Sequence, residues 1–386
     1  MERIYLDHNA TTPVLPEVME AMLPYFSGMY GNASSIHHYG QQARAGVERA
    51  REQVAALVNC RPSEVVFTSG GTESDNMAIF GAVHAAEKAR KHVVSTTIEH
   101  HAVLNACQEL ERQGVEVTYV PVSPAGLVDP EKVIQALRPE TMLVTVMLAN
   151  NEIGTLQPVA EIARQARERG VLVHTDAVQA VGKIPLDVSA LGVDLLSLSG
   201  HKIYAPKGVG ALYVRRNTRL RPQSYGGHHE RDRRAGTENV AGIVALGRAA
   251  ELALACLATE PARLAALRDR LERGILEKVG EAGRNGDPER RVPNTANLHF
   301  SHLESEALVI ALDLKGVSCS AGAACSSGAV EPSHVLTAIG LRPELARASL
   351  RFSLGRQSTE ADVDRVLEVL PAAVARLREL SPVYQP

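Results

Sequence analysis

One lysine lies in a setting that favours covalent chemistry over a surface role. Lys202 follows the apolar run 195–198 and sits in a turn between Ser199 and His201 on one side and a Pro- and Gly-rich stretch on the other. A lysine whose amine is kept partly neutral can form a Schiff base with an aldehyde cofactor. Ser199 and His201 carry groups that can hold a phosphate. A solvated surface charge is the usual alternative, but the crowding by glycine and proline makes a plain surface loop less attractive.

An aspartate follows a second apolar run. Asp176 comes after residues 171–173, and Gln179 lies three positions later. In open α/β sheets, ligands bind beyond the carboxyl ends of the strands. An acid at that place can pair with a protonated ring nitrogen. The motif alone is equally consistent with an aspartate that caps the next helix.

Two glycines between an expected strand and an expected helix form a candidate anion site. Residues 65–68 are typical of a strand, and Gly70, Gly71 and Thr72 follow. Small residues at a helix N-terminus expose backbone N–H groups, which bind phosphate well. Thr72 is also an ordinary N-cap, and a glycine-rich turn is a weak signal by itself. Both interpretations stay open for this motif.

A cysteine occupies a run of small residues. Cys325 lies in the segment 318–328, which is rich in Ser, Ala and Gly and poor in packing volume. This composition is typical of a mobile loop, in which a cysteine would be a reachable nucleophile. By itself the segment is better explained by an incidental loop thiol. The chain has five cysteines and no CxxC pair, which argues against a disulfide framework or a structural zinc site.

Three further polar residues follow or occupy expected strands. His100 comes just after the run 93–97, and Asn151 comes after the run 142–148. Arg351 lies within an alternating segment, where an arginine could hold a carboxylate through two parallel hydrogen bonds. The plain alternatives are a helix start for His100, a turn for Asn151 and a structural ion pair for Arg351.

A metal site has little support. His228, His229 and Glu230 are of ligand type, but they are consecutive and lack a distant partner at the usual ligand spacing. We therefore expect no metal, apart from a transient iron–sulfur species or persulfide at Cys325.

The elements that must position these residues alternate between strand and helix over the first two thirds of the chain. Amphipathic helical segments are expected at 47–58, 102–112 and 159–169. This alternation predicts an α/β sheet covered by helices on both faces. The expected strands are 65–68, 93–97, 115–120, 142–148, 171–175, 195–198 and 210–214.

The pattern changes after about residue 257. A long helix at 263–279, a Gly/Pro/Arg-rich loop at 281–293, a strand at 296–300, a helix from Ser305 and a terminal helix at 359–380 predict a smaller α+β domain. The 386 residues, 45% of them hydrophobic, suffice for two domains. We expect a large domain at 15–257 and a small domain formed by 1–14 and 258–386.

Charge and hydropathy exclude several partners. The formal net charge is -3, which does not indicate a nucleic-acid surface, and no stretch approaches the roughly 20 apolar residues of a membrane span. The N-terminus lacks a signal-peptide pattern. We therefore expect a cytoplasmic protein that binds neither membrane nor nucleic acid directly.

Read together, the motifs resemble class V, fold-type I pyridoxal-phosphate enzymes. More narrowly, they resemble the cysteine desulfurases of iron–sulfur cluster assembly, including the nitrogenase-associated type. The resemblance runs from the Tyr5–Thr12 motif to the Arg351–Arg356 motif, and its most specific parts are the Ser-Gly-His-Lys block and the Ala-Cys-Ser-Ser-Gly loop. It implies a fold-type I transferase whose large domain has a mostly parallel seven-stranded sheet, beside a smaller α+β domain.

The resemblance also implies a role for each site residue. Catalysis would rest on Lys202, which would hold the cofactor and move protons, on Cys325, which would receive sulfur, and on His100, which would stack on the cofactor ring. Asp176 would pair with the pyridine nitrogen, and Gln179 would hydrogen-bond the phenolic oxygen. The phosphate would be held by Gly71, Thr72, Ser199, His201 and, from the neighbouring subunit, Thr237; the substrate carboxylate would be bound by Asn151, which also lies near the cofactor, and by Arg351.

The implied reaction removes sulfur from L-cysteine, giving L-alanine and a persulfide on Cys325. Sulfur would pass to an acceptor or cluster scaffold protein, and the shared phosphate site implies a homodimer. Another class V enzyme, such as a selenocysteine lyase or an aminotransferase, is the alternative; a small-residue loop around Cys325 separates the two, because a transaminase does not need one. A scaffold that has lost its chemistry is a third interpretation, against which the intact Lys202, Asp176, His100 and Cys325 argue.

Overall fold

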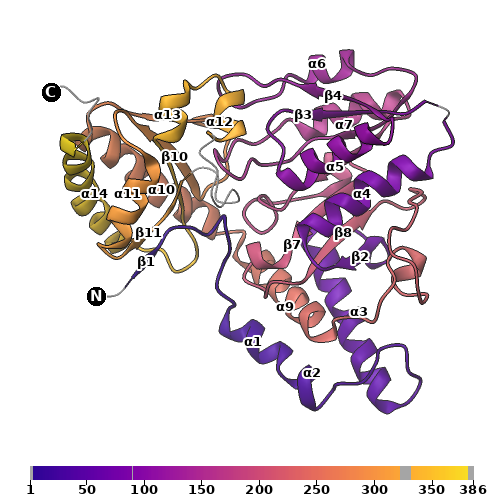
Figure 1. Ribbon diagram of the computed structural model, residues 1–386. Coiled ribbons are helices and arrows are strands. Elements are labelled where there is room, and N and C mark those ends of the chain that lie inside the picture. The colour runs from indigo at the N-terminus through magenta and orange to yellow at the C-terminus, as the bar shows by residue number, and fades with distance from the viewer. Residues whose placement is uncertain (1–2, 89, 322–331, 381–386) are drawn as a thin grey trace.

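The computed structural model describes residues 3–88, 90–321 and 332–380. Two sheet-containing parts lie side by side, and the N-terminal segment runs between them (Figure 1). The larger part holds a seven-stranded sheet in the order β2-β8-β7-β6-β5-β3-β4. Its strands are β2 (Val65–Thr68), β3 (His92–Thr96), β4 (Glu116–Val120), β5 (Thr141–Thr145), β6 (Leu172–Asp176), β7 (Leu195–Ser199) and β8 (Gly210–Val214).

All strands of this sheet except β8 run in the same direction. β8 pairs antiparallel with both β2 and β7, whereas the pairs from β7 through β6, β5 and β3 to β4 are parallel. The mostly parallel seven-stranded sheet expected from the sequence is therefore confirmed. Because six strands end at one edge, the residues that follow them meet there.

Helices cover both faces of the sheet because successive strand residues point to opposite sides. Val93, Leu143 and Leu195 pack on one face with α4 (Gly71–Ala85) and α5 (His101–Arg112). Their neighbours Val94, Val144 and Leu196 pack on the other face with α3, α7 and α9. The remaining helices of this part are α1 (Pro16–Met22), α2 (Pro24–Ser27), α3 (His38–Val58), α6 (Pro130–Gln135), α7 (Val159–Glu168), α8 (Val188–Leu191) and α9 (Val240–Cys256).

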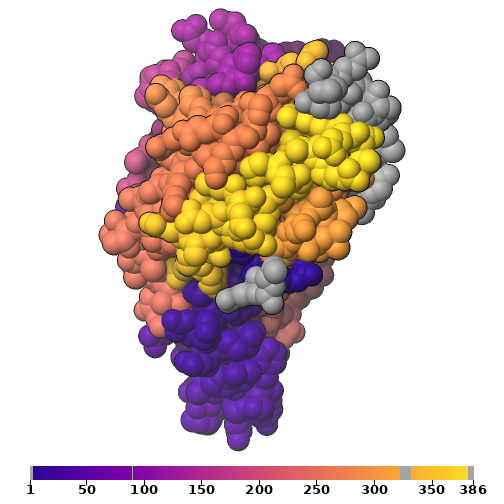
Figure 2. Space-filling model, turned by 90° about the vertical axis from the view of Figure 1, so that its left-hand side faces the viewer, coloured from indigo at the N-terminus to yellow at the C-terminus, as the bar shows by residue number. Residues whose placement is uncertain are grey.

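The smaller part has its own core around an antiparallel sheet in the order β12-β13-β10-β9. Phe300 and Phe352 are fully buried in this core, and α14 crosses the outer surface as the yellow band in Figure 2. The strands are β9 (Ala282–Arg284), β10 (Thr295–Phe300), β12 (Ser320–Ala321) and β13 (Ser349–Ser353); the helices are α10 (Glu260–Lys278), α11 (Ser305–Asp313), α12 (His334–Ala338), α13 (Pro343–Arg347) and α14 (Glu360–Leu380).

One expectation for this part was wrong. The segment 281–293 was expected to be a loop throughout, but residues Ala282–Arg284 form β9 and pair antiparallel with β10. Tertiary pairing with a neighbouring strand overrides the weak strand propensity of an Ala-Gly-Arg sequence.

The N-terminal segment connects the two parts. β1 (Ile4–Tyr5) pairs parallel with β11 (Val317–Ser318), and the His8 N–H donates to the Ser353 carbonyl at 3.1 Å. Four residues later, the Thr12 N–H donates to the His201 carbonyl at 2.9 Å. Residues 1–14 were assigned to the small domain, and that division stays a prediction.

Within the described residues, no single helix is long and apolar enough to cross a membrane. Only when taken together do α9 and α10 have the length and apolar composition of a membrane span, and the two helices are bent by 76° relative to each other.

A buried ion pair holds the long connection between β8 and α9 against the sheet. Arg51 on α3 donates to both carboxylate oxygens of Glu230 at 2.8 and 2.9 Å, and the Phe67 N–H donates to the same carboxylate at 3.0 Å. Both side chains are at most 5% exposed. Breaking such a pair leaves a charge buried without its partner.

We therefore expect Arg51→Met to lower the free energy of unfolding by about 3–5 kcal/mol, measured by urea denaturation followed by circular dichroism. Arg49→Met is the matched control, because Arg49 is exposed on the same helix. A loss in R51M that stays within about 1 kcal/mol of the R49M value would contradict a structural role for the pair.

Candidate active site

A cavity of about 370 Å³ opens at the edge where the parallel strands end. It collects the residues that follow β2, β3, β6 and β7, together with the N-terminal segment and β13. Ten of the residues singled out in the sequence line it: Gly71, Thr72, His100, Asn151, Asp176, Gln179, Ser199, His201, Lys202 and Arg351.

One described sequence candidate is not among the residues that line this cavity, and another is not described. Thr237 is exposed and is not among the lining residues, so a role there would have to involve another chain. Cys325 lies outside the residues that the structure describes.

Lys202 is aimed at the backbone of the N-terminal segment. It ends the short turn η2 (Gly200–Lys202), directly after β7. Its Nζ donates to the carbonyl oxygens of Asn9 and Ala10, the latter at 2.7 Å. Two carbonyl dipoles therefore orient the amine at the cavity wall.

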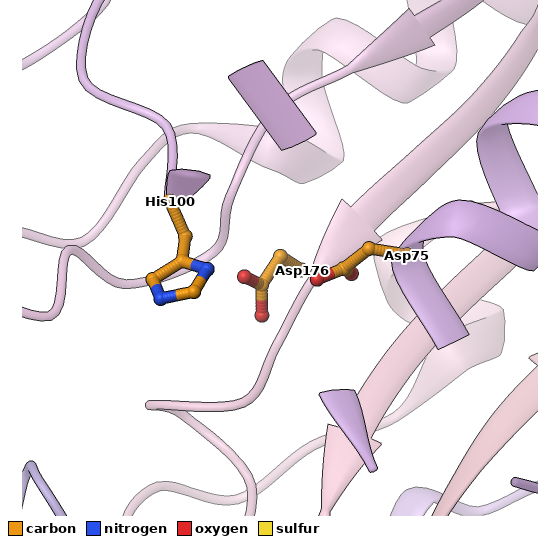
Figure 3. Close-up of side chains that lie close together, drawn as sticks. All are labelled: Asp75, His100 and Asp176. Atoms are coloured by element: carbon orange, nitrogen blue, oxygen red, sulfur yellow. The ribbon is translucent and has the colours of Figure 1, made fainter. Parts of the chain in front are cut away.

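Asp176 ends β6 and lies between His100 and a second carboxyl group, Asp75 of α4 (Figure 3). Ligand-type atoms of these three residues all lie within 4.8 Å of one another. The Asp176 Oδ1 accepts the Val178 N–H at 2.8 Å. Burial raises the pKa of Asp176 to about 6, while the Val178 N–H and the charge of Lys202 act in the opposite direction.

Asp75 is buried with one oxygen unsatisfied. Its Oδ1 has no hydrogen-bond partner among the described residues, although the His174 Nε2 lies 3.6 Å away. Burial, and then repulsion by Asp176, raise the pKa of Asp75 well above its ordinary value. Because Asp75 stays protonated, Asp176 is the carboxyl group of the two that is able to ionise and pair with a positive group.

His100 caps α5 and is held neutral. Its Nδ1 accepts the Ala102 N–H at 3.1 Å, which fixes the ring at the cavity wall. Burial, with the charges of Lys202 and His101, lowers the pKa of His100 to about 4. A neutral ring with a free nitrogen can accept a proton during a reaction.

Glu99, next to His100 in the chain, is held by hydrogen bonds in the protein interior. Its Oε1 accepts the Thr96 hydroxyl at 2.6 Å, and both of its oxygens lie 3.0 Å from the Met147 N–H. The side chain is fully buried, and burial raises its pKa to about 8. The Glu99 carbonyl also lies 2.9 Å from the His334 Nε2, which ties α12 to this wall.

The α4 N-terminus supplies the anion-binding end of the cavity. Gly70 has a φ of +156°, which residues with a side chain rarely adopt, and a Cβ at Gly210 would lie 2.6 Å from the Gly70 Cα. Both glycines are needed for this tight turn. The first N–H groups of a helix lack intrahelical partners, so Gly71 and Thr72 offer donors to an anion.

Ser199 and His201 flank that end. Ser199 ends β7 and is buried, and the His201 Nδ1 lies 3.2 Å from the Thr11 hydroxyl. Burial, with the charges of Lys202 and Lys207, lowers the pKa of His201 to about 4.

Arg351 forms the opposite end. It donates to the Asn151 carbonyl at 3.0 Å and to Asp7 at 2.7 Å, and its side chain is only 3% exposed. Its Nε has no hydrogen-bond partner among the described residues. A buried guanidinium with an unused N–H is suited to binding a small carboxylate.

These features fit an aldehyde phosphate cofactor. An oriented lysine amine, a buried acid and a helix N-terminus all face one cavity. Two buried polar atoms at the cavity, Asp75 Oδ1 and Arg351 Nε, have no hydrogen-bond partner among the described residues. They are available to a bound cofactor or substrate.

The weaker sequence candidates have ordinary partners. His228 pairs with Asp232 at 2.5 Å and Glu230 pairs with Arg51, so the residues considered as metal ligands do not converge. Cys319 is buried, and burial raises the pKa of its thiol to about 12. It is therefore a poor source of thiolate.

Sequence reasoning missed several lining residues: Asn9, Ala10, Asp75, Met147, Glu152 and His334. Asn9 and Ala10 lie inside the Tyr5–Thr12 motif that carried part of the family resemblance, so that motif was the available signal. Asp75 follows an expected helix start and looks like an ordinary exposed helix residue until the helix is packed on the sheet.

Comparisons with known proteins agree with this geometry. The family model described as "Aminotransferase class-V" matches residues 4–366. A "Cysteine desulfurase" of Trichormus azollae is 53% identical over 99% of this chain and 95% of that protein. A "Cysteine desulfurase IscS" of Dictyoglomus turgidum is 48% identical over 99% of this chain and 97% of that protein.

Two solved structures share the fold. One titled "NIFS-LIKE PROTEIN" has a TM-score of 0.91 at 37% identity and covers 97% of this chain and 100% of its own. Another, "SspA in complex with cysteine", has a TM-score of 0.82 at 37% identity and covers 91% of this chain and 98% of its own.

The raised pKa of Glu99 gives a testable pH dependence. The folded state holds the proton up to about pH 8, whereas an unfolded glutamate releases it near pH 4.5. This contribution to stability is present below pH 4.5 and is lost as the pH rises toward 8. The free energy of unfolding of the cofactor-free wild type should therefore decrease between pH 5 and 8. We expect this decrease to be smaller in Glu99→Gln by more than about 1 kcal/mol, measured by urea denaturation.

Glu131→Gln on the exposed surface of α6 is the matched control and should keep the wild-type profile. Parallel profiles for E99Q and the wild type would show that Glu99 is ionised in the folded protein throughout this range.

Proposed function

The chain belongs to the class V aminotransferase family, and we propose that within this family it is a cysteine desulfurase that takes sulfur from L-cysteine. The observation that carries the proposal is the convergence of the Lys202 amine, the Asp176 carboxylate and the α4 N-terminus on one cavity. Relatives that are about half identical over nearly the whole chain support the choice of reaction.

We propose pyridoxal 5'-phosphate as the cofactor. When bound, it supplies an electron sink that stabilises negative charge on the substrate's α-carbon. Lys202 would hold its aldehyde carbon, and Asp176 its ring nitrogen. Its other polar groups would be bound by Gly71, Thr72, Asn151, Gln179, Ser199 and His201, and its ring would stack on His100.

Substrate binding follows from the charges at the other end of the cavity. Arg351 and Asn151 would hold the carboxylate of L-cysteine, with Asp7 fixing the guanidinium plane. Lys202, once released from the cofactor, would take the proton from the α-carbon and return one. His100 is neutral above about pH 4, so it can accept a proton from a thiol at neutral pH.

The sulfur-transfer step would use Cys325. Its thiolate attacks the substrate sulfur, a sulfur–sulfur bond forms, and the carbon–sulfur bond breaks with its electron pair on carbon. Protonation of that carbon leads to L-alanine, and the persulfide stays on Cys325. An acceptor or cluster scaffold protein then takes the sulfur.

We propose that the active form is a cytoplasmic homodimer. Several large apolar side chains between α1 and α3 are exposed: Leu23 at 53%, Phe26 at 63%, Tyr30 at 64% and Ile36 at 90%. Several exposed large apolar side chains in one segment are typical of a surface that another chain covers. A second copy would also bring Thr237 to a cofactor phosphate that its own chain does not place it near.

The sulfur-transfer step can be tested at Cys325. We expect Cys325→Ala to lower cysteine-dependent sulfide and alanine production by at least about 100-fold, because the thiol is the acceptor of the sulfur. The visible absorption of the bound cofactor should be unchanged. Cys319→Ala is the matched control and should keep both products. Full activity of C325A would favour a lyase that needs no thiol, such as a selenocysteine lyase.

The homodimer can be tested at Thr237. If Thr237 acts across the dimer, a heterodimer of Lys202→Ala and Thr237→Ala chains contains one intact site. We expect mixing the two inactive or weakened variants to restore up to half of the wild-type activity per dimer, with the wild-type cofactor affinity. If Thr237 acts within its own chain, the mixture will show only the affinity of T237A.

A further inference from the structure

A second lysine lies behind the cavity and contacts it only through other residues. Lys183 follows Gln179 by four positions, after the turns that leave β6. Its Nζ donates to the Gln179 Oε1 at 2.6 Å and to the Asn9 Oδ1 at 3.1 Å. Lys183 does not line the cavity that holds Lys202 and Gln179, so it cannot act on a ligand there directly.

The contacts of Gln179 determine which way its amide faces. The Gln179 Nε2 donates to the backbone carbonyl of Asn9 at 3.0 Å. A carbonyl oxygen only accepts, so the nitrogen of the amide must point to it. The oxygen then points to Lys183, whose amine donates whether or not it is charged. Both contacts select the same orientation.

The orientation has a consequence for the cavity. An amide nitrogen carries two N–H groups, and Asn9 takes only one of them. The second N–H is left for the cavity that Gln179 lines. With the amide reversed, an oxygen would face the cavity, and it would repel an anionic oxygen of a ligand.

We propose that Lys183 is a positioning residue that locks the Gln179 amide with its N–H toward the cofactor's phenolic oxygen. This inference rests on the proposed function, because it requires a pyridoxal cofactor in the cavity. Lys183 acts through Gln179 and touches neither cofactor nor substrate.

The surroundings of Lys183 favour a neutral amine, which still donates hydrogen bonds, over a charged ammonium group. Burial lowers its pKa well below the ordinary value, and the positive charges of Lys202 and Arg351 lower it further. Asn9 also receives the Asn294 Nδ2 at 3.1 Å, so the acceptors around Lys183 are themselves fixed. The amine is therefore held in one place as a hydrogen-bond donor.

The test reads the visible absorption band of the cofactor-loaded protein as a function of pH. An N–H that donates to the phenolic oxygen withdraws electron density from it, which lowers the pH at which the bound chromophore loses its proton. We expect Lys183→Met to raise this midpoint by roughly one pH unit. Lys132→Met on the exposed face of α6 is the matched control and should not move it.

A double-mutant cycle separates positioning from a general structural effect. Gln179→Met should raise the midpoint at least as far as K183M, and the double variant K183M/Q179M should match Q179M within about 0.3 units, because Lys183 has nothing left to orient. Shifts that add, or an unchanged midpoint in K183M, would overturn the inference.

Two further outcomes are decisive. If K183M does not fold, Lys183→Gln keeps a neutral N–H donor for Gln179 and must show the wild-type midpoint within about 0.3 units; a shift like that of Q179M in K183Q would contradict the inference. If the wild-type protein shows no visible band after addition of pyridoxal 5'-phosphate, the proposed function fails together with this inference. A normal wild-type band with no effect of K183M overturns the inference alone.

Discussion

The arrangement of the site depends on the hydrogen bonds that the N-terminal segment makes through Asn9 and Ala10. The carbonyl oxygens of these two residues accept the Lys202 amine, and the Asn9 carbonyl also accepts the Gln179 amide. A carbonyl oxygen has two lone pairs, so one backbone group can orient two side chains of the large sheet. The direction of both side chains therefore depends on where this segment lies.

The same segment is anchored on the antiparallel sheet. The Asn9 Nδ2 donates to the Thr295 hydroxyl at 2.8 Å, and the Asn9 N–H donates to the Ser353 hydroxyl at 2.9 Å. Both partners belong to strands of that sheet, next to Arg351 on β13. The antiparallel sheet thus supplies the arginine and also holds the residues that aim Lys202, which couples the two ends of the cavity.

Burial supplies the electrostatic character of the cavity. It raises the pKa of Asp176 to about 6 and lowers the pKa of His100 to about 4, so the carboxylate binds a proton more tightly than the imidazole, the reverse of their order in water. Asp75 next to Asp176 adds a second carboxyl group, which burial and repulsion keep protonated. Such shifts concentrate where a site must hold charged groups and exchange protons.

Much of the fold could be predicted because its signals are local. Short apolar runs followed by Gly, Asp or Lys located the strands of the large sheet and the edge at which the candidates gather. The remaining features depend on contacts distant in sequence. β9 exists because β10 pairs with it, and the role of Asn9 requires Lys202 and Thr295, hundreds of residues away. Asp75 and Lys183 resemble ordinary polar residues until burial changes their pKa values.

The central claim is that Lys202 is the residue that holds an aldehyde cofactor. The direct measurement is to add pyridoxal 5'-phosphate to the purified protein, reduce it with borohydride, digest it and map the modified peptide by mass spectrometry. We expect one modified site per chain, on the peptide that contains Lys202. Modification mainly of Lys183 or Lys207, or no stable modification above that of a denatured control, would contradict it.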